Sequence, residues 1–127
     1  MRDEETKIEE IKTALKEFAK ERDWEQFHTA KDLAIAVSVE AAEILEHFRF
    51  RNGKDLEEYL ANEENKRELS YELADVMAFL SRLSEVTGID LAKAVEEKME
   101  LNRKKYPVGK ANGWGWVQAK KEAGGKE

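Results

Sequence analysis

The sequence predicts an all-α fold. Its 127 residues include one proline, Pro107, and seven glycines that lie mostly near the C-terminus, so few residues interrupt a helix. Hydrophobic residues make up 41% and charged residues 39%, a mixture that suits exposed helices with one buried stripe better than a disordered chain. Apolar residues also recur at spacings of three and four. At this length we expect one domain with a modest core.

The first expected helix runs from Glu5 to about Arg22. Lysine and glutamate separate its apolar residues, which have the spacing of an amphipathic helix: Ile8, Ile11, Leu15 and Phe18. Residues 23–28 interrupt this rhythm and contain two aromatic side chains and a histidine. Thr29 then favours the start of a new helix, because its hydroxyl can accept a hydrogen bond from a free amide in the first turn.

A second helix is expected from about Ala30 to Phe50. Its apolar residues do not share one stripe: Leu33, Ile35, Val37, Val39, Leu45 and Phe48. A helix that is apolar over more than one face is central in a fold or lies at a subunit interface. Gly53 is the predicted position for the left-handed turn that ends this helix.

Two helical segments are expected next. Residues from Asp55 to about Ala61 favour a short helical turn, and residues from Glu63 to Glu85 favour a long helix. Thr87 and Gly88 then stop the long helix, because glycine readily adopts the left-handed backbone conformation found at helix ends.

The last expected helix begins after Asp90, which serves as its N-cap, and reaches Tyr106. After Pro107 the helical periodicity disappears and glycines become frequent. We therefore expect a folded domain of residues 1–107, followed by a flexible C-terminal tail of residues 108–127.

The charge and composition exclude several classes of protein. The 28 acidic and 22 basic residues give a net charge of -6, which is the wrong sign for general nucleic-acid binding. The absence of cysteine excludes disulfides and thiolate zinc sites. Met1 is followed at once by charged residues rather than an apolar targeting region, and no apolar run is long enough to span a bilayer. We expect a cytoplasmic protein that binds neither nucleic acid nor membranes.

Two acidic pairs with the same internal spacing lie within the expected helices: Glu40 with Glu43, and Glu72 with Asp75. Residues three apart lie on the same face of a helix, so each pair directs two carboxylates one way. Two such helices side by side would form a four-carboxylate cluster. Because clustered carboxylates repel one another, a divalent cation is the expected compensator. The pairs would also suit exposed sides of amphipathic helices, and the spacing alone leaves both interpretations open.

The available ligand types favour a hard cation. Oxygen ligands suit Mg²⁺ or Mn²⁺, whereas zinc needs more nitrogen or sulfur than two histidines supply. A di-iron bundle needs Glu-x-x-His on two helices, and here only Glu25 and His28 fit that motif. His47 falls four residues after Glu43, but neither histidine is informative by itself.

Two further groups of residues are candidates for substrate contacts. Lys98, Asn102 and Tyr106 recur every four residues, and together they offer donors for phosphate oxygens and a sugar hydroxyl. A solvated helix face is the alternative interpretation of this stripe. Three aromatic residues suit either the core or a base-binding site: Trp24, Phe27 and Phe50. Trp24 is the best candidate of the three, because it lies at a helix junction where a ring can be half exposed.

Taken together, these motifs resemble the all-α nucleotide pyrophosphohydrolases related to MazG, and within them the dCTP pyrophosphatase-like branch. The family pattern is Glu-x-x-Glu on one helix and Glu-x-x-Asp on the next, which the four acids match. Further segments similar to that branch occur in the same order at residues 21–28, 40–48, 72–76 and 98–107. The resemblance covers roughly residues 8–107.

The resemblance implies a four-helix-bundle-like subunit that assembles into homodimers or homotetramers, with active sites completed between subunits. It also implies Mg²⁺-dependent hydrolysis of a nucleoside triphosphate, such as dCTP, to the monophosphate and pyrophosphate, in nucleotide-pool house-cleaning. The implied metal ligands are Glu40, Glu43, Glu72 and Asp75. The implied substrate-binding residues are Trp24, His28, Lys31, Phe50, Lys98, Asn102 and Tyr106.

The implied mechanism relies on the cation to orient a water molecule for in-line attack on the α-phosphorus, and Glu43 is the candidate to accept the proton of that water. The chain departs from the branch at Phe50, where tryptophan is usual, at Ala30, where proline is frequent, and at Leu15, where some members have histidine. These departures affect the preferred base more than the type of reaction. Two alternatives stay open, namely a non-catalytic helical interaction protein and a sister enzyme acting on dUTP or phosphoribosyl-ATP.

Overall fold

The computed structural model describes residues 1–124 and contains six α-helices and two short 3-10 helices. The described residues form no β-strand, so the predicted all-α class is confirmed. The chain divides into two compact units, the first ending at Ile89 and the second beginning at Asp90.

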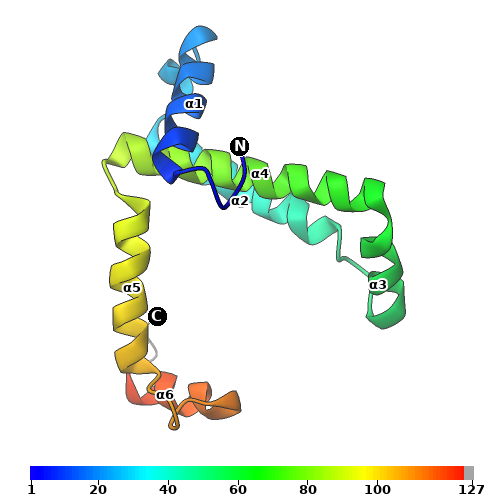
Figure 1. Ribbon diagram of the computed structural model, residues 1–127, viewed down its shortest axis with the longest axis vertical. Helices are drawn as coiled ribbons and strands as arrows, with labels where there is room; N and C mark the ends of the chain where they lie inside the picture. The colour runs from blue at the N-terminus through cyan, green and yellow to red at the C-terminus, as the bar shows by residue number, and fades with distance from the viewer. Residues whose placement is uncertain (125–127) are drawn as a thin grey trace. The chain divides into compact units, whose positions relative to one another are not determined.

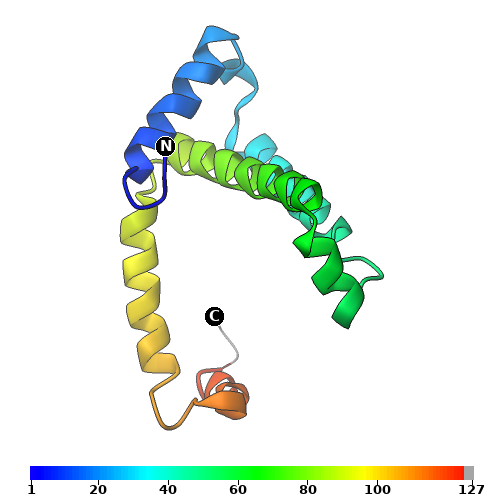
Figure 2. The same ribbon diagram turned by 45° about the vertical axis from the view of Figure 1, so that its right-hand side comes forward.

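The first unit is built around two long antiparallel helices, α2 (Ala30–Glu46) and α4 (Glu63–Thr87), which lie side by side (Figure 1). Helix α3 (Gly53–Ala61) connects them at one end. At the other end α1 (Ile8–Glu21) crosses the C-terminal part of α4, as Figure 2 shows from a second direction. This arrangement places the two acid-bearing helices against each other.

The N-terminal ends of the first two long helices have clear local causes. Helix α1 begins at Ile8 rather than at Glu5, because the carboxylate of Glu10 accepts a hydrogen bond of 2.7 Å from the backbone amide of Lys7. The 3-10 helix η1 (Glu25–Phe27) follows α1 in the segment that interrupts the periodicity. The predicted cap of α2 is confirmed, since Thr29 Oγ1 accepts from the amide of Asp32 at 3.1 Å.

The C-terminal end of α2 differs from the prediction. The helix ends at Glu46 instead of Phe50, and the left-handed residue that follows is Phe50, with φ of 63°. Arg51 explains the early end, because its guanidinium donates a hydrogen bond of 2.7 Å to the carbonyl of His47 and so satisfies a group that the helix leaves free. Gly53 also has positive φ, 49°, but it is the first residue of α3.

The predicted end of α4 is confirmed. The helix continues to Thr87 and ends at Gly88, whose φ of 72° lets the next amide turn back and donate to the carbonyl of Ser84 at 2.8 Å. Asp90 is the N-cap of the following helix, as predicted, since its carboxylate accepts from the amide of Lys93 at 2.9 Å.

The second unit consists of α5 (Leu91–Lys105), the 3-10 helix η2 (Gly113–Gly115) and α6 (Trp116–Glu122). Gly115 is required here by a close approach, because an added Cβ would lie 2.5 Å from the carbonyl oxygen of Lys110. Regular helical turns thus occur within residues 108–127, the stretch expected to be a flexible tail. The domain boundary at residue 107 stays a prediction.

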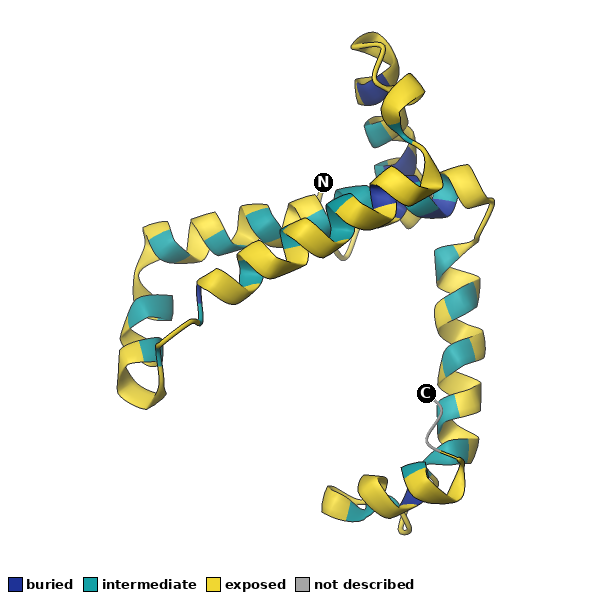
Figure 3. Cartoon of the chain, turned by 180° about the vertical axis from the view of Figure 1, so that it is seen from behind, coloured by how far each residue is buried: buried dark blue, intermediate teal, exposed yellow. Residues whose placement is uncertain are grey.

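Most buried residues of the first unit lie where α1 meets the end of α4 (Figure 3), whereas His47 is buried just after α2. Those at the α1–α4 contact include Lys12, Ala19, Ser81, Arg82 and Ser84. By contrast, large apolar residues on α2 and α4 stay exposed: Ile35, Val39, Leu45, Leu73, Met77 and Leu80. Among the described residues, no helix has the length and apolar character needed to cross a membrane.

Candidate active site

Where α2 packs on α4, the four predicted acids lie close enough for their charges to act on one another. Burial raises the pKa of Glu40, and the charge of Glu43 and a hydrogen bond with it raise that pKa further, followed by the charges of Asp75 and Glu72. The Oε2 atom of Glu40 is buried and receives no hydrogen bond from a donor group within residues 1–124. The four carboxylates therefore form a cluster in the electrostatic sense, because the charges of the other three act on Glu40.

The donor set of this cluster fits a hard divalent cation. All four candidate ligands are carboxylates, the ligand type that Mg²⁺ and Mn²⁺ prefer. In the part of the chain that the structure describes, no group of three or more histidine or acidic side chains is arranged so that it could hold a metal ion. The observation that supports a cation is instead the buried, unpartnered oxygen of Glu40 beside a second carboxyl group.

A polar pocket of about 250 Å³ lies beside the cluster. Its lining residues come from α2, the turn after it, α3 and α4: Glu43, Glu46, His47, Arg51, Tyr59 and Glu72. His47, which is only 7% exposed, contacts the Glu72 carboxylate oxygen Oε2 through Nε2. Its other ring nitrogen, Nδ1, lies 2.6 Å from the hydroxyl of Tyr59.

The sequence reasoning did not assign roles to His47, Arg51 and Tyr59. One signal for His47 was present, because it lies four residues after Glu43 and therefore on the same face of the helix. Tyr59 could not be found this way, since its position beside His47 depends on the turn between α2 and α3.

A second pocket, of about 290 Å³, is largely apolar. It brings together Trp24, His28 and Asp75, which the sequence assigned separately to base binding and to the metal site. The remaining lining residues are Leu15, Phe18, Ala19, Ala78, Phe79 and Arg82. Trp24 is 45% exposed and contacts Phe18 edge to face, with ring centroids 5.7 Å apart. The ring of this tryptophan at the helix junction is therefore half exposed.

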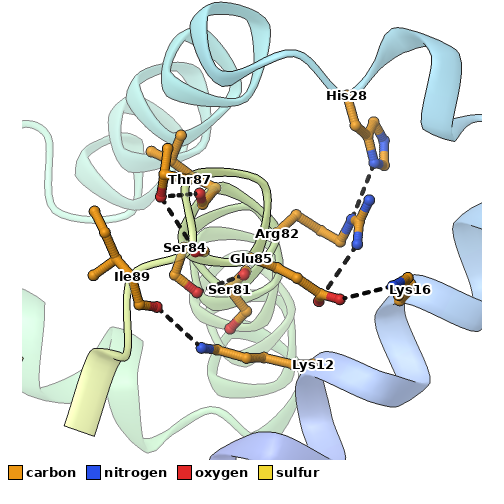
Figure 4. A network of polar contacts seen from close by, with 10 residues as sticks. Lys12, Lys16, His28, Ser81, Arg82, Ser84, Glu85, Thr87 and Ile89 are labelled. Carbon is orange, nitrogen blue, oxygen red and sulfur yellow. Dashed lines mark hydrogen bonds and ion pairs between the residues drawn. The ribbon is translucent and has the colours of Figure 1, made fainter. Parts of the chain in front are cut away.

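A chain of polar contacts holds His28 in this second pocket (Figure 4). The Nε atom of Arg82 donates a hydrogen bond of 3.2 Å to His28 Nδ1. Arg82 also pairs with Glu85 at 3.5 Å, and Glu85 pairs with Lys16 of α1 at the same distance.

Burial and the charge of Arg82 hold the pKa of His28 below its ordinary value of 6.5, while Glu25 acts in the opposite direction. Since an arginine Nε–H can only donate, Nδ1 of His28 is the acceptor and the proton of the neutral ring lies on Nε2. Arg82 is a further residue that the sequence reasoning did not single out.

The structure does not bring every predicted site residue to these pockets. Phe50 is 88% exposed and is not among the residues that line the apolar pocket. Lys31 is exposed in the first turn of α2. The remaining three candidates, Lys98, Asn102 and Tyr106, belong to the second unit, where they follow one another along α5 and its end and are each partly buried.

The fold and the acid-bearing helices define the class of this protein: the chain belongs to the MazG-like family, whose model matches residues 35–115. The matched region contains all four acids.

Particular relatives support the same family. The chain is 36% identical over 106 residues to dCTP pyrophosphatase 1 of Rattus norvegicus, covering 84% of this chain and 62% of that protein. It is 36% identical over 101 residues to the protein of the same name from Homo sapiens, covering 80% of this chain and 59% of that protein. The match therefore spans less than two thirds of the length of these relatives.

A solved structure is also similar. A pyrophosphatase from Archaeoglobus fulgidus has 39% sequence identity and a TM-score of 0.72, with 84% of this chain and 98% of that chain covered. This likeness confirms the all-α fold of the family over most of the described chain.

Proposed function

We propose that this chain hydrolyses nucleoside triphosphates to the monophosphate and pyrophosphate, with dCTP or related pyrimidine nucleotides as the preferred substrates. The observation that carries the proposal is the cluster of four carboxylates between α2 and α4, in which the pKa of Glu40 is raised by burial and by the other three acids. Membership of the MazG-like family and the names of the relatives support the type of reaction.

The four acids Glu40, Glu43, Glu72 and Asp75 would hold Mg²⁺, with Mn²⁺ as a substitute. When bound, such a cation supplies neutralisation of the triphosphate oxygens, polarisation of the α-phosphorus and a lower pKa for a coordinated water molecule. Its site would join the two helices, since two of the ligands lie on α2 and two on α4.

Glu43 is the proposed proton acceptor. Its side chain is exposed and lines the polar pocket, whereas the Glu40 carboxyl contains a buried oxygen. An accessible carboxylate in contact with a second acid can take a proton from an attacking water molecule and pass it on to solvent. Glu40 is by this argument the better structural ligand of the pair.

The apolar pocket is the proposed site for the base. Trp24 offers a half-exposed ring for stacking, and His28 offers a donor at Nε2 for an acceptor atom of the base or sugar. We extend the proposal to Lys31, Phe50, Lys98, Asn102 and Tyr106 as substrate contacts, on the strength of the family resemblance alone.

We further propose that the chain forms homodimers or homotetramers. The support is the exposed apolar surface on α2 and α4, which leaves side chains such as Leu45 at 67% and Leu73 at 52% exposure. Exposed apolar surface also fits a non-catalytic interaction protein, so the assay below has to separate the two functions.

A product assay tests the proposed reaction. The purified protein is incubated with Mg²⁺ and each common dNTP and NTP, with phosphoribosyl-ATP in a separate reaction, and the nucleotides are resolved by anion-exchange chromatography. We expect the monophosphate without the diphosphate, loss of product with EDTA, and the fastest turnover with dCTP. Preference for dUTP or phosphoribosyl-ATP would assign the chain to a sister enzyme. Cleavage of none of them, with Mg²⁺ or Mn²⁺, would favour the interaction protein.

A further inference from the structure

Three side chains from three helical segments form a continuous chain of contacts that ends at one of the proposed metal ligands. Tyr59 of α3 contacts His47, the residue that follows α2, and His47 contacts Glu72 of α4. His47 is buried at 7% exposure, and Tyr59 and Glu72 are partly buried. A buried histidine whose two nitrogens both have partners has a defined ring orientation.

The partners of His47 allow an arrangement of protons in which both ring nitrogens face a suitable group. A tyrosine hydroxyl can donate to Nδ1, which leaves the proton of the neutral ring on Nε2. In that arrangement Nε2–H faces Glu72 Oε2, the atom that it contacts. One carboxylate oxygen of Glu72 thereby has the imidazole as its neighbour, and this contact orients the carboxylate.

Tyr59 is itself held in place by neighbouring groups. The guanidinium of Arg51 lies 3.8 Å from the centroid of the Tyr59 ring and also donates to the carbonyl of His47 at 2.7 Å. The side-chain amide of Asn65 donates to the carbonyl of Tyr59 at 3.1 Å. Tyr59 is therefore held in two ways, because Arg51 packs on the face of its ring and Asn65 binds its backbone carbonyl.

We propose that His47 and Tyr59 are positioning residues, which orient the Glu72 carboxylate for cation binding. Through Tyr59, helix α3 would contribute to the metal site without contacting substrate. This inference rests on the proposed function for the identity of Glu72 as a ligand. Partners that orient a metal ligand contribute to metal affinity, and their loss typically costs about 10-fold to 100-fold. The residues that line the pocket beside the acids would then support the metal site.

A purely structural role is the competing explanation, in which the same contacts only stabilise the connection between α2 and α4. Tyr59→Phe separates the two roles, because it keeps the ring and its contact with Arg51 and removes only the hydroxyl that donates to His47. Tyr71→Phe is the matched control, since it removes the same atom from an exposed tyrosine on α4, next to Glu72 in the sequence.

The test measures binding of Mn²⁺ alone to the nucleotide-free protein by electron paramagnetic resonance, with circular dichroism as a check of folding. We expect Tyr59→Phe to weaken Mn²⁺ binding about 10-fold and His47→Leu to weaken it by up to about 100-fold. Tyr71→Phe should bind like wild type. His47→Gln should restore part of the affinity, because its side-chain amide can donate to Glu72 from nearly the same place as Nε2.

The outcomes separate this inference from the proposed function. If wild type binds Mn²⁺ and hydrolyses nucleotides while Tyr59→Phe binds Mn²⁺ equally well and only melts at a lower temperature, the positioning role is wrong and the function stands. If wild type binds no Mn²⁺, both the metal site and the positioning role are wrong. Should His47→Leu fail to fold, the comparison of Tyr59→Phe with Tyr71→Phe decides the question.

Discussion

The two pockets differ in chemistry although each is lined by an acid of the same cluster. The polar pocket includes Glu43 and Glu72, whereas the apolar pocket includes Asp75. Charged and hydrogen-bonding groups dominate the first, and hydrocarbon and aromatic side chains dominate the second. Helix α4 therefore contributes both to a site for charge and to a site for a planar ring.

Two histidines show the same contrast at the two ends of α2. His47 has a carboxylate and a phenol as partners, so its ring connects an acid to the rest of the fold. His28 has a guanidinium as its partner, which opposes protonation. The residue type is the same, and the neighbours that the tertiary structure supplies give each ring a different role.

Glu40→Gln should have the largest effect, because the charges of acids that line both pockets act on Glu40. A bound cation stabilises the transition state by several kcal/mol. Loss of one of its ligands should therefore reduce turnover by about 10³-fold or more. Glu68→Gln, an exposed acid one turn before Glu72, is the control and should keep turnover. The product assay described above measures the turnover of both variants. If Glu40→Gln kept most of its activity, the acid cluster would have no essential part in the reaction.

The same substitution should stabilise the metal-free protein. The raised pKa of Glu40 means that the folded state loses stability as pH rises from the ordinary value of 4.5 through the raised value. Glutamine has no such ionisation, so the melting temperature of Glu40→Gln should exceed that of wild type by a margin that grows with pH across this window. Calorimetry at several pH values with EDTA measures the difference, and a lower melting temperature would contradict the repulsion inferred among the acids.

Trp24→Ala tests the apolar pocket. Stacking of a base on an aromatic ring contributes about 1–3 kcal/mol, so KM for dCTP should rise by about 5-fold to 150-fold, with a smaller change in kcat. Phe27→Ala is the matched control, since it removes an exposed aromatic residue of η1 that does not line the pocket. Steady-state kinetics check this split, and equal KM values for the two variants would place the base elsewhere.

Arg82→Met should disturb the apolar pocket through His28. Loss of the buried guanidinium should cost about 1–3 kcal/mol of stability. The cost stays in this range because Glu85 keeps its contact with Lys16. The pKa of His28 should also rise toward 6.5. Wild type should lose stability as pH falls below 6.5 through the lowered pKa, and the variant should lose less of it.

Nuclear magnetic resonance titration of the His28 ring and thermal melts at several pH values measure these changes. Arg67→Met, at an exposed arginine of the same helix, should leave the titration of His28 unchanged. An unshifted titration in Arg82→Met would mean that burial alone sets the pKa of His28.

Thr29→Ala should have the smallest effect. It removes the hydroxyl that accepts from the amide of Asp32, and loss of an N-cap typically costs about 1 kcal/mol. Because Thr29 follows His28 directly, a small rise in KM should accompany the lower melting temperature, while Mn²⁺ affinity should stay at the wild-type value. A large loss of Mn²⁺ affinity would show that the two ends of α2 are coupled.

The sequence alone was sufficient for the fold class, most helix boundaries and the family. Thr29, Gly88 and Asp90 mark helix ends by interactions within a few residues, so local chemistry predicts them. The four acids could be found because a spacing of three places each pair on one helix face. The end of α2 was misplaced, since it depends on Arg51 reaching back to the carbonyl of His47.

Only the tertiary structure decided which side chains surround these acids. Tyr59 meets His47, and Arg82 meets His28, across 12 and 54 residues of sequence, respectively. Such contacts arise from the way α1, α3 and α4 pack on one another, which no local periodicity encodes. The sequence therefore determined which groups are available for chemistry, while packing decided which of them are buried together, and with that their orientation and protonation.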